Sequence, residues 1–173
     1  MDPLRDTSGA RRTHEPMSAN VIRDTDYCCQ EDGMVGLGPG ARSYTRSLHY
    51  STEYAVGQTG VKMIIQDFNA RNAASYGSAD FGARLSLEEQ KLRYVIKSLL
   101  RAEGVFHVAY QQRFGSEMHD DAPQLRELSE LGLATDDGVA LRLNDEGLTW
   151  SDTIGPWLYS ESVTERMDAY ELA

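Results

Sequence analysis

Apolar residues at helical spacing are most regular between Ser86 and Gly104, in the stretch SLEEQKLRYVIKSLLRAEG. Steps of three and four residues along one side of this stretch predict a single buried stripe, which comprises Leu92, Val95, Ile96, Leu99 and Leu100. Ser86 and Glu89 have the spacing of a capping box, and Gly104 can take the left-handed conformation that ends a helix. We therefore expect an amphipathic helix here, around which the following elements pack.

Shorter patterns follow this helix. The first is a short helix that carries Val108 and Phe114 and is closed by Gly115. The second is a helix that starts at Asp121, buries Leu125, Leu128 and Leu131, and stops at Gly132. The third is a β-hairpin over residues 133–143 that turns at Asp136-Asp137-Gly138. A further helix capped by Asn144 carries Trp150, Ile154, Trp157 and Leu158 and is kinked at Pro156, and a last helix is capped by Ser162 and Glu165. Three helices followed by a hairpin and a closing helix are typical of a winged-helix-like domain, which we place at residues 85–173.

Residues 27–84 have a different pattern. A short strand is predicted at Met34–Leu37, with glycines crowded at its end, and an amphipathic helix over residues 59–71 with Thr59 as its cap. Residues 72–84 are small and polar, which is typical of a surface loop. Residues 1–26 contain few large apolar side chains, so we expect this segment to be disordered or loosely attached.

Gly36, Gly38 and Ala41 imitate the GxGxxA fingerprint of dinucleotide-binding loops. The preceding strand is short, and no long helix clearly starts after Ala41, so a tight turn or another kind of ligand-facing strand end is favoured over a dinucleotide site.

The net charge of −10, from 27 acidic and 17 basic residues, disfavours binding to phosphate backbones. The third helix of the winged-helix-like pattern would present one basic side chain, Arg126, and two acidic ones, Glu127 and Glu130, to a DNA groove. This composition also disfavours sequence-specific DNA binding. We expect no nucleic-acid partner.

The cysteines number two, and they are adjacent: Cys28 and Cys29. Neither a stapling disulfide framework nor a metal site is expected from neighbouring thiols. No stretch has the apolar length of a signal peptide core or a membrane span, so we expect a reduced, cytoplasmic chain without a membrane partner.

Several stretches taken together resemble the C-terminal part of oxygen-independent coproporphyrinogen III oxidases and their relatives, which are radical S-adenosylmethionine enzymes. They are MVGLGPGARSY, LSLEEQKLRYVIKSLLRAEG, QLRELSELGLA and RLNDEGLTWSDTIGPWLYS. The resemblance covers residues 27–172. It implies an α+β, mainly helical chain: the late strand and helix edge of a partial β/α barrel at residues 27–84, followed by a helical domain that covers substrate.

The resemblance also implies where ligands lie. Gly36, Gly38, Gly40 and Ala41 would line cofactor or substrate at the strand end, with Tyr27 and Gln30 just before it; these residue assignments come from the family alone. The family uses S-adenosylmethionine and a 4Fe–4S cluster held by CxxxCxxC, a motif that this sequence lacks.

We therefore interpret the chain as the substrate-covering region of a longer coproporphyrinogen-oxidase-like oxidoreductase. It would be inactive alone, would bind no cofactor by itself, and would pair with the remainder of the barrel or a partner chain around a porphyrinogen-like substrate. The alternative is a non-catalytic winged-helix-like module that binds a protein partner or a porphyrin. Haem ligation by His107 or His119 is conceivable in that case, whereas packing or surface roles are favoured for both, and a solvated role for His14.

Overall fold

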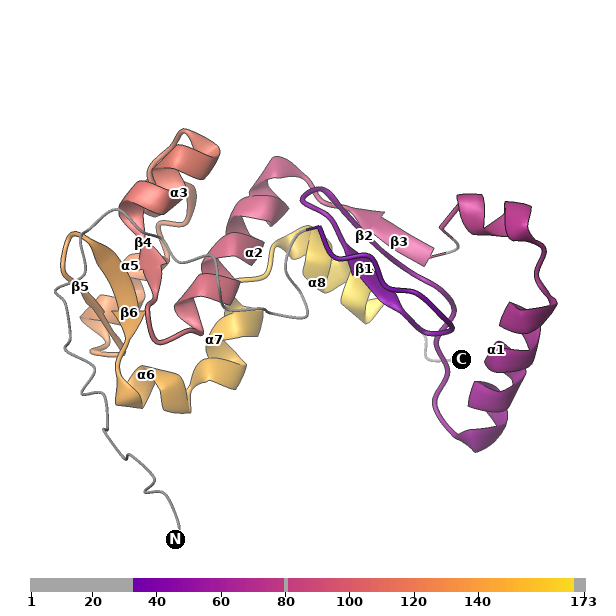
Figure 1. Cartoon of the computed structure of the whole chain (residues 1–173). Coiled ribbons are helices and arrows are strands. Elements are labelled where there is room, and N and C mark those ends of the chain that lie inside the picture. Colours follow the sequence, from indigo (N-terminus) through magenta and orange to yellow (C-terminus); the bar gives the residue numbers. More distant parts are fainter. Residues whose placement is uncertain (1–32, 80, 170–173) are drawn as a thin grey trace, which may run out of the picture.

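The computed structural model describes residues 33–79 and 81–169, which form an elongated molecule of mixed α/β structure, about half helical, with two small antiparallel sheets (Figure 1). The strands are β1 (Arg42–Tyr44), β2 (Leu48–Ser51), β3 (Phe81–Arg84), β4 (Val105–Phe106), β5 (Ala134–Asp136) and β6 (Ala140–Leu143). The helices are α1 (Gln58–Ala70), the 3-10 helix η1 (Ala73–Gly77), α2 (Leu87–Leu99), α3 (His107–Phe114), α4 (Met118–Asp121), α5 (Leu125–Glu130), α6 (Asp145–Thr149), α7 (Ser151–Trp157) and α8 (Glu161–Asp168). The described residues include no helix long and apolar enough to cross a membrane.

The first sheet has the order β1-β2-β3, and both pairings are antiparallel. The strand predicted at Met34–Leu37 is reduced to one bridge between Met34 and Tyr44, because the chain turns at Gly38 and Gly40, which both have positive φ. The surface loop predicted at 72–84 instead contains η1 and β3. These antiparallel pairs differ from the parallel strands expected at the edge of a β/α barrel.

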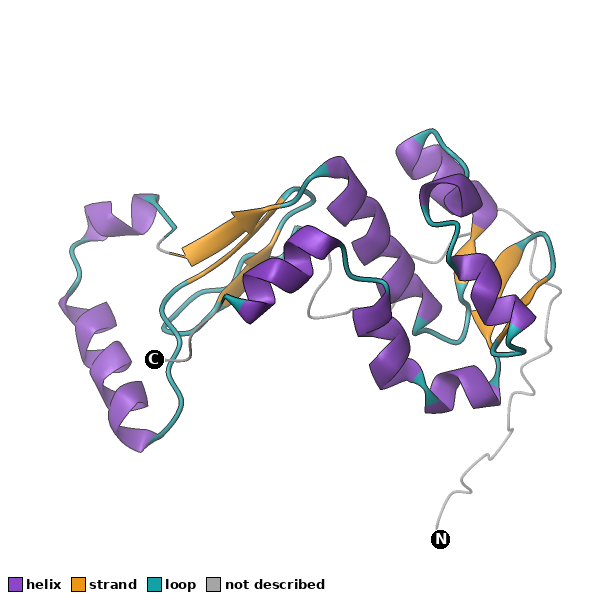
Figure 2. Cartoon of the chain, turned by 180° about the vertical axis from the view of Figure 1, so that it is seen from behind, coloured by secondary structure: helices purple, strands orange, loops and turns teal. Residues whose placement is uncertain are grey.

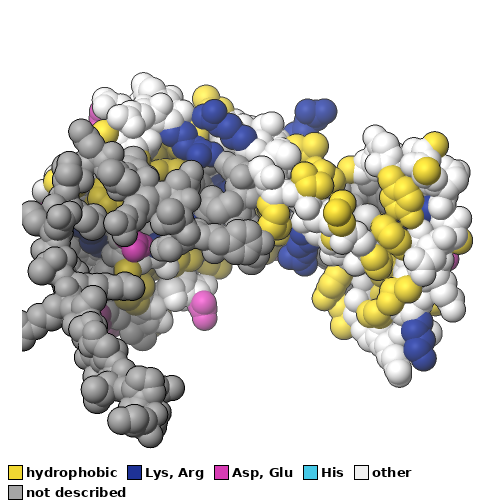
Figure 3. Space-filling view, viewed as in Figure 1, with side chains coloured by type: hydrophobic (Ala, Val, Ile, Leu, Met, Phe, Trp, Pro, Cys, Tyr) yellow, Lys and Arg dark blue, Asp and Glu magenta, His cyan; other side chains and the backbone are white. Residues whose placement is uncertain are grey.

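Helix α1 agrees with the helix predicted at 59–71, but Gly57 occupies the capping position in place of Thr59. None of its residues is buried, and Val61, Met63 and Ile65 are all more than 40% exposed. Hydrophobic side chains gather over this end of the molecule in Figure 3. The apolar face of α1 is therefore uncovered in the described part of the chain.

Helix α2 confirms the capping box between Ser86 and Glu89. Leu92, Val95 and Leu99 of its stripe are buried, whereas Leu100 is 40% exposed because the helix ends at Leu99. The predicted end at Gly104 is therefore too late, and Gly104 (φ 72°) instead leads the chain into β4.

The second sheet has the order β4-β6-β5 and contains the predicted hairpin. Around it and α2 lies one hydrophobic core, which comprises Leu92, Val95, Leu99, Val105, Tyr110, Met118, Ala122, Leu125, Leu128, Ala134, Leu141, Ile154 and Leu158. Figure 2 shows the helices of this unit surrounding the small sheet. The core is built entirely from residues after position 85.

The predicted helix start at Asp121 and the predicted burial of Leu131 are wrong. Asp121 ends α4 instead of capping a helix, because its carboxylate accepts hydrogen bonds from Lys91, Tyr110 and Ser116. Helix α5 starts at Leu125, and Leu131 at its end is 70% exposed instead of buried.

The C-terminal helices differ from the prediction in a similar way. Asn144 caps α6 as expected, but the single kinked helix is divided at Trp150 into α6 and α7. Helix α8 is capped by Ser160, whereas the predicted cap, Ser162, donates a hydrogen bond to Glu89.

Candidate functional site

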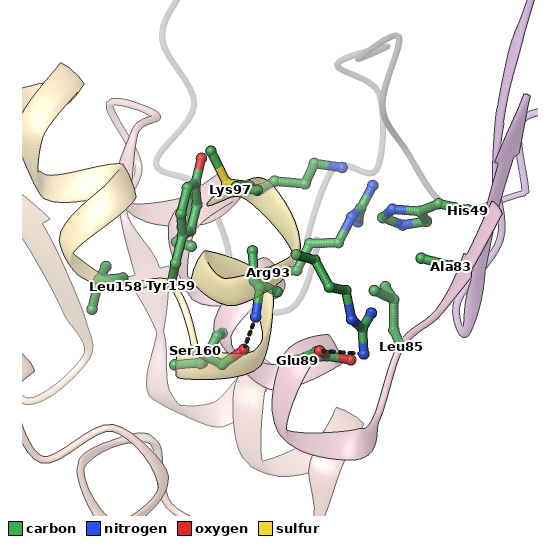
Figure 4. A pocket seen from close by; sticks show the side chains of 14 residues that line it. His49, Ala83, Leu85, Glu89, Arg93, Lys97, Leu158, Tyr159 and Ser160 are labelled. Carbon is green, nitrogen blue, oxygen red and sulfur yellow. Dashed lines mark hydrogen bonds and ion pairs between the residues drawn. The ribbon is translucent and has the colours of Figure 1, made fainter. Parts of the chain in front are cut away.

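A groove of about 650 Å³ lies between the first sheet, α2 and α8 (Figure 4). Strands β2 and β3 form one wall, α2 the floor, and α8 with the segment before it the opposite wall. Its lining comprises His49, Ala83, Leu85, Glu89, Leu92, Arg93, Ile96, Lys97, Leu158, Tyr159, Ser160, Val163, Arg166 and Met167. This volume is within the usual range for sites that bind small molecules.

The groove combines apolar walls with an excess of positive charge. Arg93 and Lys97 stand one helical turn apart on α2, and Arg166 comes from α8. Glu89 is the one carboxylate among the lining residues of the described chain. Such a surface suits a ligand with an apolar body and anionic substituents.

Glu89 ties α2 to α8 at the end of this groove. Its carboxylate accepts hydrogen bonds from the backbone N–H of Ser86 and from the hydroxyl of Ser162, both at 2.7 Å, and lies 3.6 Å from the guanidinium of Arg166. Burial raises the pKa of Glu89, but the hydrogen bonds from Ser162 and Ser86 and the charge of Arg166 outweigh it, so the pKa lies below its usual value. Glu89 is therefore an ionised structural group.

Aromatic and cationic contacts hold the first sheet against α2. The guanidinium of Arg93 lies over the ring of Tyr44 at 5.6 Å from its centroid, and Tyr44 meets His49 edge-on. At the β1–β2 turn, Arg46 donates a hydrogen bond to the carbonyl of Arg113 at 3.0 Å. These contacts join the first sheet to α2 and α3.

The glycine-rich loop is not part of this groove. The N–H of Gly36 donates to Ser43 Oγ at 3.0 Å, and a Cβ at position 36 would collide with the carbonyl of Arg42. The turn of the loop therefore requires glycine at position 36 for steric reasons, and it favours glycine at positions 38 and 40 because φ is positive there. Strand β1, and not a helix, follows Ala41, so the dinucleotide fingerprint lacks its helix N-terminus.

Other predicted residues fall elsewhere. Tyr27, Gln30, Cys28, Cys29 and His14 lie outside the described residues.

The donor set of the chain does not fit a cluster of the family's kind. Two adjacent cysteines cannot supply the three thiolates that CxxxCxxC provides.

Sequence reasoning missed the groove because its walls come from segments more than 70 residues apart. Only the floor left a signal in the sequence: Arg93 and Lys97 recur at i and i+4 beside the apolar stripe of α2. The opposite wall, with Ser160, Val163 and Arg166, could not be assigned to the groove without the fold.

Comparisons with known proteins identify the region that forms the floor. No curated protein and no solved structure matches the chain significantly. Residues 85–150 match the family model of the HemN C-terminal domain. This range contains α2 to α6 and the whole second sheet. Residues 85–150 are therefore similar to a HemN C-terminal domain, which is consistent with the C-terminal part of a HemN-like radical S-adenosylmethionine protein.

Proposed function

We propose that this chain is the substrate-covering region of a coproporphyrinogen III oxidase-like radical S-adenosylmethionine oxidoreductase, and that the groove holds part of a porphyrinogen-like substrate. The observation that carries the proposal is the apolar, cation-lined groove next to α2, the first helix of the HemN C-terminal domain. A porphyrinogen has an apolar ring system bearing carboxylates, which matches the leucine, isoleucine and valine walls and the side chains of Arg93, Lys97 and Arg166.

The uncovered surface supports a role beside other polypeptide. The apolar side chains of α1 face solvent in the described chain, and β3 is an edge strand of the first sheet. Exposed apolar helices and open strand edges favour association with a further protein surface. The occupant that we propose is the remainder of the enzyme's barrel, which supplies the cluster and S-adenosylmethionine site, so the isolated chain is inactive.

A titration with coproporphyrin III, a stable oxidised analogue of the substrate, tests the groove. We expect saturable quenching of porphyrin fluorescence by the chain, and an affinity reduced about thirtyfold in the double variant Arg93→Gln/Lys97→Gln, since two ion pairs worth about 1 kcal/mol each are lost. The matched control, Lys62→Gln on α1, keeps the affinity of the unchanged chain. Binding that is equal in all three proteins, or equally strong for the tetramethyl ester that lacks the carboxylates, contradicts the proposed groove.

Anaerobic reconstitution tests whether another polypeptide supplies the iron–sulfur cluster. The isolated chain treated with iron and sulfide is expected to hold no stoichiometric cluster, because its two adjacent thiols supply too few ligands. A stable cluster with cleavage of S-adenosylmethionine would refute the proposal that another polypeptide supplies this chemistry.

A second candidate function is a self-contained, winged-helix-like module that binds a protein partner or a porphyrin without catalysis. It is favoured by the order α2-β4-α3-α4-α5-β5-β6 and by a core confined to residues after 85. Limited proteolysis is then expected to leave a compact core that starts near Leu85. Cleavage within α2 to α7 as fast as within residues 33–84 would count against this module.

A further inference from the structure

Two histidines and one aspartate converge on the side of the second sheet, away from the groove. His107 is the first residue of α3, His119 lies in α4, and Asp136 is the last residue of β5. Their potential ligand atoms all lie within 4.8 Å of one another. Three elements that are separated along the chain thus bring imidazole and carboxylate groups together.

The carboxylate of Asp136 lies between the two rings. Its Oδ1 is 2.8 Å from Nε2 of His107, and its Oδ2 is 2.8 Å from Nε2 of His119. The side chains of the three residues are between 18% and 24% exposed, so the cluster is shielded yet open to solvent on one side. Both imidazoles therefore direct Nε2 toward the carboxylate of Asp136.

The carboxylate is fixed in orientation. The backbone N–H of Gly138 donates to Oδ1 at 3.0 Å, which holds the side chain in the hairpin turn. The ionised form of a carboxylate is the one that binds metals.

We propose that His107, His119 and Asp136 bind a divalent transition-metal ion, with Zn²⁺ as the best match. Two imidazole nitrogens and one carboxylate oxygen are a donor set that Zn²⁺ accepts at about 2.0–2.2 Å, with water in a fourth position. Mg²⁺ and Ca²⁺ prefer sites made of oxygen ligands alone. The open side of the cluster leaves room for the fourth ligand.

Binding needs only a small rearrangement. A tetrahedral site with these bond lengths places its ligand atoms about 3.4 Å apart, so the widest pair must approach by about 1.5 Å at most. A neutral imidazole that binds a metal through Nε2 carries its single proton on Nδ1, so each ring takes this tautomer when the metal replaces its hydrogen bond to Asp136.

The metal would fasten the hairpin to the helices beside it. Asp136 precedes the β5–β6 turn, whereas both histidines belong to the α3–α4 segment. A ligand that binds only the folded arrangement raises the melting temperature of the chain by an amount that grows with the logarithm of its free concentration above Kd. The expected role is therefore a structural clamp with one exchangeable position.

Calorimetric titration of the chelator-treated full chain with Zn²⁺ tests the site. The background carries Cys28→Ser and Cys29→Ser, so that the thiols cannot bind the metal. We expect one Zn²⁺ per chain, a higher melting temperature with Zn²⁺, and no change with Mg²⁺. Co²⁺ should give the intense visible absorption of a four- or five-coordinate site. Absence of stoichiometric Zn²⁺ binding in this background overturns the proposal.

Single substitutions locate the site. His107→Gln, His119→Gln and Asp136→Asn are each expected to weaken Zn²⁺ binding more than tenfold. Two controls, His49→Gln and Asp137→Asn, should bind as the background does, since neither residue belongs to the cluster. If a cluster variant fails to fold, long-range ¹⁵N spectra of the unsubstituted rings replace it: Zn²⁺ should shift Nε2 of His107 and His119 and leave His49 unchanged. Binding that survives all three substitutions, or shifts confined to other histidines, refutes the site.

Discussion

Replacing Glu89 by alanine tests how α8 is held against α2. Glu89 is only 6% exposed, and its carboxylate joins the first turn of α2 to Ser162 of α8. The substitution removes the hydrogen bonds to the backbone N–H of Ser86 and to the Ser162 hydroxyl. It also leaves Arg166 without this partner.

The expected loss follows from these contacts. Hydrogen bonds to a charged group contribute about 1.5–3 kcal/mol each, and the freed Ser86 and Ser162 groups regain part of this from water because both residues are exposed. Arg166 is 55% exposed, so its ion pair adds little. We expect Glu89→Ala to lower the free energy of unfolding by about 2–4 kcal/mol at neutral pH.

The control is Glu88→Ala, which removes an exposed carboxylate from the same first turn of α2. This substitution loses only the interaction with the helix dipole, about 0.3–1 kcal/mol. Urea unfolding monitored by circular dichroism compares the two variants with the unchanged chain.

The effect also depends on pH, with a defined sign. The pKa of Glu89 in the folded chain lies below its usual value of 4.5, so ionised Glu89 stabilises the fold above that pH. This stabilisation is lost as the pH falls through the lowered pKa, and the difference between the unchanged chain and Glu89→Ala should shrink there. Equal losses in the two glutamate variants, or a difference that does not shrink in acid, would refute this account.

Two further pairs of substitutions test the packing of the C-terminal unit. Gly104→Ala places a side chain at φ 72° that collides with the carbonyl of Leu141, and should cost about 3 kcal/mol or more, whereas Gly132→Ala, at φ 70° in open space, should cost about 1–2 kcal/mol. Equal losses in these two glycine variants, measured by urea unfolding, would contradict the close approach at Gly104. Leu99→Ala empties a fully buried position and should cost about 2–5 kcal/mol, against less than about 0.5 kcal/mol for Leu131→Ala at a 70% exposed position. A Leu131→Ala loss as large as that of Leu99→Ala in the same assay would mean that the end of α5 is buried.

Local patterns predicted much of the C-terminal fold. The capping box of α2, the closure of α3 at Gly115, the β5–β6 hairpin and the Asn144 cap all depend on contacts within a few residues. The spacing and the residue types along the sequence are sufficient to predict such contacts.

The predictions were wrong where a residue far away in the sequence determines the hydrogen bonds of a side chain. Asp121 has the sequence of a helix cap, but Lys91, 30 residues away, and Tyr110 engage its carboxylate. Ser162 likewise donates to Glu89, 73 residues away, which leaves the capping position to Ser160. The groove and the histidine–aspartate cluster are also assembled from distant segments, so spacing along the chain could not reveal them.

The central claim is that the groove between α2, α8 and the first sheet receives a carboxylated tetrapyrrole. Amide chemical-shift mapping of the full chain with coproporphyrin III tests it most directly. We predict saturating shifts in Arg93, Lys97 and Val163, with the β5–β6 hairpin unchanged. Shifts centred on the hairpin and α3, with α2 and α8 unaffected, would contradict the claim.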